Sequence, residues 1–122
     1  VCTRATIGDA AMNTVPMATN QGFKSLVPNK ANDSNYLYYL ILTLKKTFIR
    51  FSSGSTFLEL SKKDFAKTTV TIPESIEEQR KIAEIMIDID EEIELLKTKR
   101  TMLMDQKRGL MQRLLTGKVR VK

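Results

Sequence analysis

The segment from Glu74 to Arg108 constrains the fold most, because it contains neither glycine nor proline. It is rich in Glu, Ile, Lys and Leu, and its apolar residues recur every seven positions in two rows four residues apart. Such rows are the two seam positions of a coiled coil, although Arg100 and Lys107 interrupt the second row. The predicted helix–helix interface consists of Ile82, Ile89, Leu96, Leu103 and Leu110 in the first row, with Met86, Ile93 and Leu114 in the second.

This pattern predicts one helix of about 43 residues, or about 60–65 Å, ending near Thr116 with Gly117 as its C-cap. A domain of the size of residues 1–73 is only about 25 Å across. Much of the helix must therefore project, which disfavours the alternative of an amphipathic helix packed on a core. The seam needs a partner, which is another copy, another segment of a longer chain or another protein.

The part before the helix has the pattern of short strands and short helices. In residues 1–34, apolar pieces punctuated by Gly, Asn and Pro predict strands joined by turns. Residues 34–50 carry an apolar stripe at helical spacing, for which Ser34 is the candidate cap. Ser61 has a capping pattern that predicts a single turn leading to Phe65, and residues 70–72 read as a strand.

The predicted fold class is therefore α+β, with one long coiled-coil helix after a partial domain of strands and helices. The predicted divisions are residues 1–73, residues 74–117 and a tail of residues 118–122. The sequence begins at Val1 without an initiator Met, and its first residues do not have the pattern of a signal peptide. We therefore expect an upstream segment that is missing here.

Composition argues against catalysis by this chain. Cys2 is the one cysteine and histidine is absent, which excludes an internal disulfide, a cysteine zinc site and a Ser-His-Asp triad. Phosphate-binding and nucleophile-elbow motifs are also missing. The acidic residues between Asp88 and Glu94 spread around a helix and are read as a solvated face. We expect a non-catalytic chain with no cofactor and no metal.

The same composition points to a compartment. No apolar run reaches the roughly 20 residues of a membrane span, so no membrane association is expected. Low cysteine use fits a reducing cytoplasm.

Charge and polar residues give candidates for nucleic-acid contact. The net charge is +6, but residues 74–100 carry −4 and residues 101–122 carry +5. Ser, Thr, Lys, Arg, Asn and Gln side chains supply phosphate contacts and base-edge contacts. The predicted DNA-binding residues are Arg4, Thr6, Asn20, Gln21, Lys24, Ser53, Ser55, Thr56, Lys62 and Lys63.

Each of these candidates has an ordinary structural alternative. The serine-rich loop around Ser53 is also a plain connector, Asn20 and Gln21 also form a turn, and Arg4 is also a surface cation. Tyr36, Tyr38 and Tyr39 have aromatic faces on which bases stack, but helical spacing favours core positions for two of the three.

Blocks along the whole chain carry a family resemblance. In order they are Thr3-Arg4-Ala5-Thr6-Ile7-Gly8-Asp9, Pro16-Met17-Ala18-Thr19-Asn20-Gln21-Gly22-Phe23, Tyr36-Leu37-Tyr38-Tyr39-Leu40, Gly54-Ser55-Thr56, Leu60-Ser61-Lys62-Lys63-Asp64-Phe65, Ile72-Pro73, Glu77-Glu78-Gln79-Arg80-Lys81-Ile82-Ala83-Glu84-Ile85 and Lys107-Arg108-Gly109-Leu110-Met111-Gln112-Arg113-Leu114-Leu115-Thr116-Gly117. The chain resembles the C-terminal target recognition domain and spacer helix of type I restriction–modification specificity subunits.

The resemblance implies a non-catalytic component that reads one half of a split target in double-stranded DNA. In that family two long helices pair antiparallel as a spacer and dock the methylation subunits, and the complete complex recruits restriction subunits. The implied partner of the seam is a second copy or the second half of a longer specificity subunit. The alternative is a truncated remnant that serves only as a coiled-coil dimerisation or interaction module, without DNA readout.

Overall fold

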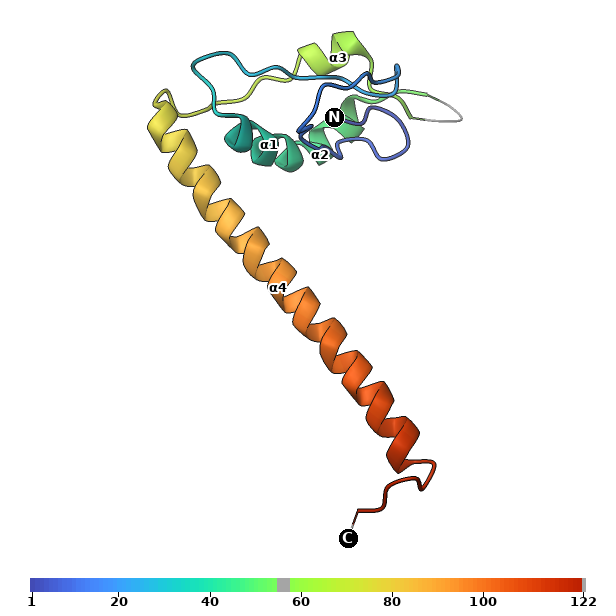
Figure 1. Cartoon of the computed structure of the whole chain (residues 1–122). Coiled ribbons are helices and arrows are strands. Elements are labelled where there is room, and N and C mark those ends of the chain that lie inside the picture. Colours follow the sequence, from blue (N-terminus) through green and yellow to red (C-terminus); the bar gives the residue numbers. More distant parts are fainter. Residues whose placement is uncertain (55–57, 122) are drawn as a thin grey trace. The chain divides into compact units, whose positions relative to one another are not determined.

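The structure is a computed structural model that describes residues 1–54 and 58–121 (Figure 1). The chain divides into two compact units, Val1–Glu84 and Ile85–Lys122. The described residues are mostly helical, and one long helix dominates them. The helices are α1 (Ser34–Thr43), α2 (Lys45–Phe51), α3 (Lys62–Ala66) and α4 (Ile76–Leu114).

Helix α1 begins one residue earlier than the predicted cap at Ser34 would place it. Asp33, not Ser34, is the N-cap, and its carboxylate accepts from the backbone nitrogens of Asn35 and Tyr36. An aspartate at this position satisfies two N–H groups that have no partner within the helix. The apolar stripe of residues 34–50 is divided between two helices, because the chain turns at Leu44 before α2 begins.

A small apolar core holds the first unit together. Ile7, Ile41, Phe48 and Leu60 are buried and form its centre. The Phe48 ring stacks on Phe65 with the ring centroids 5.2 Å apart. This contact joins α2 to α3, so the predicted turn after Ser61 is confirmed as a short helix, and the Ser61 hydroxyl oxygen accepts from the Asp64 nitrogen.

The predicted strands are wrong for the residues that the structure describes. Residues 1–34 and 70–72 contain no strand, and pairing is limited to isolated β-bridges between Cys2 and Phe23, Arg4 and Glu59, and Ser53 and Glu59. Backbone conformation accounts for this near the start of the chain. Ala5 and Gly8 have φ values of 55° and 88°, which bend the chain directly after Arg4 and prevent extended pairing.

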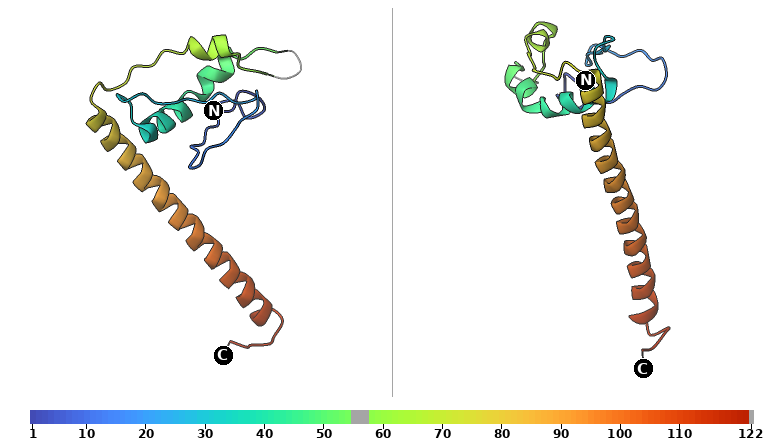
Figure 2. Two further views of the ribbon diagram at one scale, coloured as in Figure 1. Left: turned by 45° about the horizontal axis from the view of Figure 1, so that its top comes forward. Right: turned by 90° about the vertical axis from the view of Figure 1, so that its left-hand side faces the viewer.

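Helix α4 confirms the long helix predicted from the heptads, with slightly different ends. It contains 39 residues and is uninterrupted in both views of Figure 2. At its start the Ser75 hydroxyl oxygen accepts from the Glu78 nitrogen, which places the cap after the predicted start at Glu74. At its end Gly117 has a φ of 71° and its nitrogen donates to the Leu114 carbonyl, as a glycine does after a helix.

Candidate nucleic-acid interface

Three segments of the first unit meet at Glu59, a residue that carried no prediction from the sequence. The Glu59 nitrogen donates to the Ser53 carbonyl over 3.0 Å, and the Ser53 nitrogen donates to the Glu59 carbonyl over 3.1 Å. Glu59 also bridges to Arg4. The next residue, Leu60, is fully buried and its nitrogen donates to the Thr3 carbonyl. The backbone of Glu59 is therefore held from two sides.

The side chains of Arg4 and Glu59 form an ion pair. The distance from Nη2 of Arg4 to Oε2 of Glu59 is 2.8 Å. The hydrogen bond from Arg4 is the main cause that holds the pKa of the Glu59 carboxyl below its ordinary value, and the charge of Lys24 lowers this pKa further. The same hydrogen bond raises the pKa of Arg4. Two cations and one carboxylate thus form one electrostatic group.

The segment of residues 20–24 borders this ion pair. The Asn20 side-chain oxygen accepts from the Gly22 nitrogen over 2.9 Å, which confirms the turn, and Nζ of Lys24 donates to the Gln21 carbonyl over 3.2 Å. A Cβ atom added to Gly22 would lie 3.1 Å from Oδ1 of Asn20 and 4.0 Å from Cδ of Arg4. The glycine therefore leaves room for the Asn20 side chain beside the backbone, with Arg4 close by.

Five predicted DNA-binding residues are thus brought together. We name them, with the carboxylate between them, the Glu59 cluster. Its members are Arg4, Asn20, Gln21, Lys24, Ser53 and Glu59.

Thr6 makes its contacts with a different group of residues. Its side chain hydrogen-bonds to Asp9, and the Asp9 carboxylate lies 2.6 Å from Nζ of Lys45 on α2. The hydrogen bond from Lys45 is the main cause that lowers the pKa of Asp9, and the bond to Thr6 adds to it. Thr6 therefore supports a second ion pair, which Asp9 and Lys45 form between residues 4–9 and α2.

Two of the remaining candidates, Lys62 and Lys63, lie on α3. Both are exposed on this helix of five residues, and Lys63 lies in its last turn. The charge of Lys63 also helps to lower the pKa of the Asp64 carboxyl. Ser55 and Thr56 lie outside the residues that the structure describes.

The tyrosines of α1 lie mainly against the protein. Tyr36 is buried, and the half-buried rings of Tyr38 and Tyr39 meet edge to face with centroids 5.1 Å apart. This arrangement favours the core interpretation over base stacking for Tyr36.

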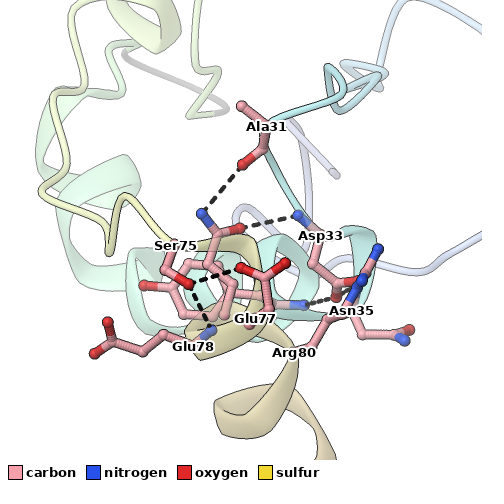
Figure 3. Close-up of polar contacts among 9 residues, drawn as sticks. Ala31, Asp33, Asn35, Ser75, Glu77, Glu78 and Arg80 are labelled. Carbon is pink, nitrogen blue, oxygen red and sulfur yellow. Dashed lines mark hydrogen bonds and ion pairs between the residues drawn. The ribbon is translucent and has the colours of Figure 1, made fainter.

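Gln79 joins α4 to the rest of the first unit, and this role was also missed from the sequence. Its side chain is fully buried. The amide oxygen accepts from the Asp33 nitrogen, and the amide nitrogen donates to the Ala31 carbonyl (Figure 3). The amide nitrogen also donates to the Pro73 carbonyl. An uncharged amide among charged neighbours was the signal that the sequence offered.

The predicted helix–helix interface is largely exposed. Ile82 is half-buried, but the seam residues from Met86 to Leu114 are all exposed. Leu110 and Leu114 line a shallow hollow of about 360 Å³ near the end of α4. Its other lining residues are Gln106, Lys107, Met111 and Leu115. An apolar row of this length in contact with water is typical of a surface that another chain or segment covers.

Two further properties concern only the described residues. In residues 1–54 and 58–121, no three His, Cys, Asp or Glu side chains are grouped as they would be to hold a metal ion. Within the same ranges no helix combines the length and the apolar character needed to cross a membrane.

Comparisons with known proteins agree with the resemblance in the sequence. Residues 1–104 match the family described as the type I restriction modification DNA specificity domain. The type I restriction enzyme MjaIX specificity subunit of Methanocaldococcus jannaschii is 41% identical over 95 residues, which cover 75% of this chain and 21% of the relative. The putative MjaX specificity subunit of the same organism is 29% identical over 123 aligned residues, covering 100% of this chain and 29% of the relative.

A third relative from that organism, the MjaVIII specificity subunit, is 34% identical over 89 residues, which cover 72% of this chain and 20% of the relative. This chain thus spans 20% to 29% of the length of these relatives. The match over residues 1–104, together with the long heptad helix, places the chain in the family of type I restriction–modification DNA specificity domains.

Proposed function

We propose that this chain is a non-catalytic sequence-specificity component of a type I restriction–modification system. It reads one half of a split target in double-stranded DNA through its first unit. Its long helix docks methylation subunits, and the assembled complex recruits restriction subunits. The observation that carries this proposal is the match of residues 1–104 to the DNA specificity domain family.

The Glu59 cluster supports DNA readout by the first unit. It combines a guanidinium, an ammonium group and the side-chain amide of Asn20, which come from separate segments of the chain. Arginine pairs with guanine and asparagine or glutamine with adenine in the major groove, while lysine and serine contact phosphate. Lys62 and Lys63 add positive charge that would attract any duplex.

Charge along α4 supports an antiparallel helix partner. The part of the chain that begins at Glu74 is acidic up to Arg100, and residues 101–122 are basic. In an antiparallel pair the acidic half of one helix faces the basic half of the other, whereas a parallel pair would align like charges. The partner is a second copy of this chain or the second half of a longer specificity subunit. A cytoplasmic location without membrane association belongs to the same proposal.

The alternative function is a truncated specificity-subunit remnant that acts only as a coiled-coil dimerisation or interaction module. The exposed apolar row of α4 favours this alternative independently of any DNA contact. Such a remnant would pair through the seam and bind duplexes weakly and without preference.

Duplex binding at several salt concentrations distinguishes the two functions. A specificity component should show a steep fall of affinity with salt and a preference for particular duplexes from a randomised pool. Binding that is weak and equal for all duplexes would contradict DNA readout and favour the remnant. Replacement of Asn20 by Ala should relax the sequence preference more than it lowers the affinity for unrelated duplexes.

A further inference from the structure

We propose that the Arg4–Glu59 pair reads a single G·C base pair in the major groove, and that Glu59 is the residue that makes Arg4 specific. Arg4 would take the guanine edge, and the carboxylate of Glu59 would accept from the amino group of the paired cytosine. This inference rests on the proposed function, because it names the ligand of the Glu59 cluster.

The geometry of the pair leaves both groups able to bind a base. Glu59 receives the Arg4 bond on Oε2, so Oε1 remains to accept from a cytosine amino group. Arg4 uses Nη2 for this bond, and a guanidinium carries further N–H donors in a fixed planar fork. Guanine presents two acceptors to such a fork, and cytosine presents the one donor that a carboxylate can accept. The two partners of the ion pair therefore match the two partners of the base pair.

The backbone fixes where these groups project. Arg4 and Glu59 face each other in a β-bridge, and Glu59 is bonded in both directions to Ser53. The following Leu60 is buried in the core. A carboxylate that projects from a backbone held in this way orients the guanidinium before any ligand arrives, which lowers the entropy lost on binding.

The exposure of the pair argues against a purely structural role. The side chain of Arg4 is 48% exposed and that of Glu59 is 40% exposed. Ion pairs in contact with water contribute little to the stability of a fold. Both side chains are also accessible to a ligand as they stand.

The negative charge of Glu59 decides between base and phosphate. Without it, Arg4 and neighbouring Lys24 would be two cations free to bind any phosphate. The carboxylate offsets one of these charges and would repel a phosphate placed against it, whereas bases carry no net charge. Glu59 therefore shifts Arg4 from sequence-independent attraction towards base readout.

A selection experiment with the full 122-residue chain tests this inference. Duplexes randomised at their centre are selected, and the affinity of the selected duplex is compared with that of a duplex carrying A·T at each G·C position in turn. The unaltered chain should prefer G·C at one position by roughly five- to a hundredfold. Glu59→Gln should reduce that preference by about tenfold and raise the affinity for unrelated duplexes, because a negative charge is lost.

Two further variants act as controls. Glu94→Gln removes the same charge on α4, where Glu94 pairs with Lys97 over 2.6 Å, and should leave the base preference unchanged. Arg4→Lys keeps the positive charge but replaces the fork by a point charge, so it should lose the G·C preference while keeping the affinity for unrelated duplexes. Circular dichroism of each variant verifies that the helices are retained.

The other outcomes overturn the inference in distinguishable ways. If Glu59→Gln selects the same duplex with the same preference, Glu59 does not set specificity and DNA readout by the first unit stands. A uniform loss of affinity for all duplexes would assign Glu59 a structural role only. If the unaltered chain selects no sequence, the proposed function fails and this inference fails with it.

Discussion

The amide oxygen of Gln79 lies 2.9 Å from the backbone nitrogen of Asp33, which is the residue that caps α1. One buried side chain of α4 thus bonds to the first turn of α1 across 46 positions of sequence. Asp33 adds a weaker contact, because its carboxylate lies 3.8 Å from Nε of Arg80. The start of the long helix is therefore attached to the rest of the first unit by hydrogen bonds and by this weaker ion pair.

Replacing Gln79 by Ala should lower the free energy of unfolding of the first unit by about 1–3 kcal/mol. The change leaves the Asp33 nitrogen and the Ala31 and Pro73 carbonyls without their partner in a partly buried place. Urea unfolding followed by tyrosine fluorescence measures this, because all three tyrosines lie in α1. Lys81→Ala, at an exposed position two residues on, should change stability by less than about 0.5 kcal/mol. Equal effects of the two changes would contradict the role of Gln79.

Replacing Gly8 by Ala should also destabilise the first unit, by about 1–3 kcal/mol. Gly8 has a φ of 88°, and an added Cβ would lie 2.9 Å from Cα and Cγ of Lys45. The new methyl group would push α2 away from the 4–9 turn and strain the Asp9–Lys45 ion pair. Thermal unfolding measured by circular dichroism gives the result.

Gly109 supplies a control of opposite sign. It lies within α4, and a Cβ added there would meet no atom within 4 Å. Gly109→Ala should therefore stabilise α4 by about 0.5–1 kcal/mol, because alanine loses less conformational entropy in a helix than glycine. Stabilisation by both substitutions would show that Gly8 does not lie against Lys45.

Replacing Arg4 by Gln should raise the pKa of Glu59 towards its ordinary value, although Lys24 should still hold it lower. Carboxyl NMR titration of the chain measures this. Asp9 is an internal reference, because its lowered pKa depends mainly on Lys45 and should not change. Since the pKa of Glu59 is lowered in the folded state, the ion pair contributes its stability above the ordinary pKa of 4.5. This contribution is lost as the pH falls through the lowered value.

The elements that the sequence predicted correctly are those that depend on interactions between residues close together in the chain. The heptads that run from Ile82 to Leu114 were sufficient for α4, because helix formation and its apolar period are local properties. The pattern at Ser61 likewise sufficed for α3. The strands of residues 1–34 were wrong, since the positive φ values at Ala5 and Gly8 break the pairing and only the second is a glycine.

The candidate site was predictable only in part, because no local sequence pattern marks Glu59, the residue that its members share as a neighbour. Arg4, Asn20 and Ser53 were selected by residue type, yet their common neighbour Glu59 stands in an ordinary alternation of polar and apolar residues. Only the tertiary contact between residues 4, 53 and 59 shows that they share a surface. Gln79 was missed for the same reason, as two of its three partners, Ala31 and Asp33, lie on a segment 46 to 48 positions away in the sequence.

Replacing Lys62 and Lys63 together by Ala should lower the affinity for all duplexes alike. If each lysine neutralises one phosphate, the slope of log affinity against log salt should become shallower by about 1.8. Fluorescence anisotropy between about 50 and 200 mM salt measures this slope. Lys97→Ala with Lys99→Ala removes the same charge from α4. If that pair changed the slope equally, the effect would come from net charge rather than from contacts at α3.

Placing aspartate at Leu96 and Leu103 together should abolish self-association or partner binding through α4, because both residues lie in the apolar row and charges cannot be buried there without partners. The matched control is Leu95→Asp with Met102→Asp, since these residues are even more exposed but lie outside both seam rows. Light scattering behind a sizing column measures the result.

A mass near 28 kDa, about twice the 13.9 kDa of one chain, would show pairing with a second copy. A mass near 14 kDa would assign the seam to another segment or subunit, and the double change should then abolish binding to methylation subunits instead. If the seam variant assembled as the control does, α4 would use another face and the assignment of the seam would be wrong.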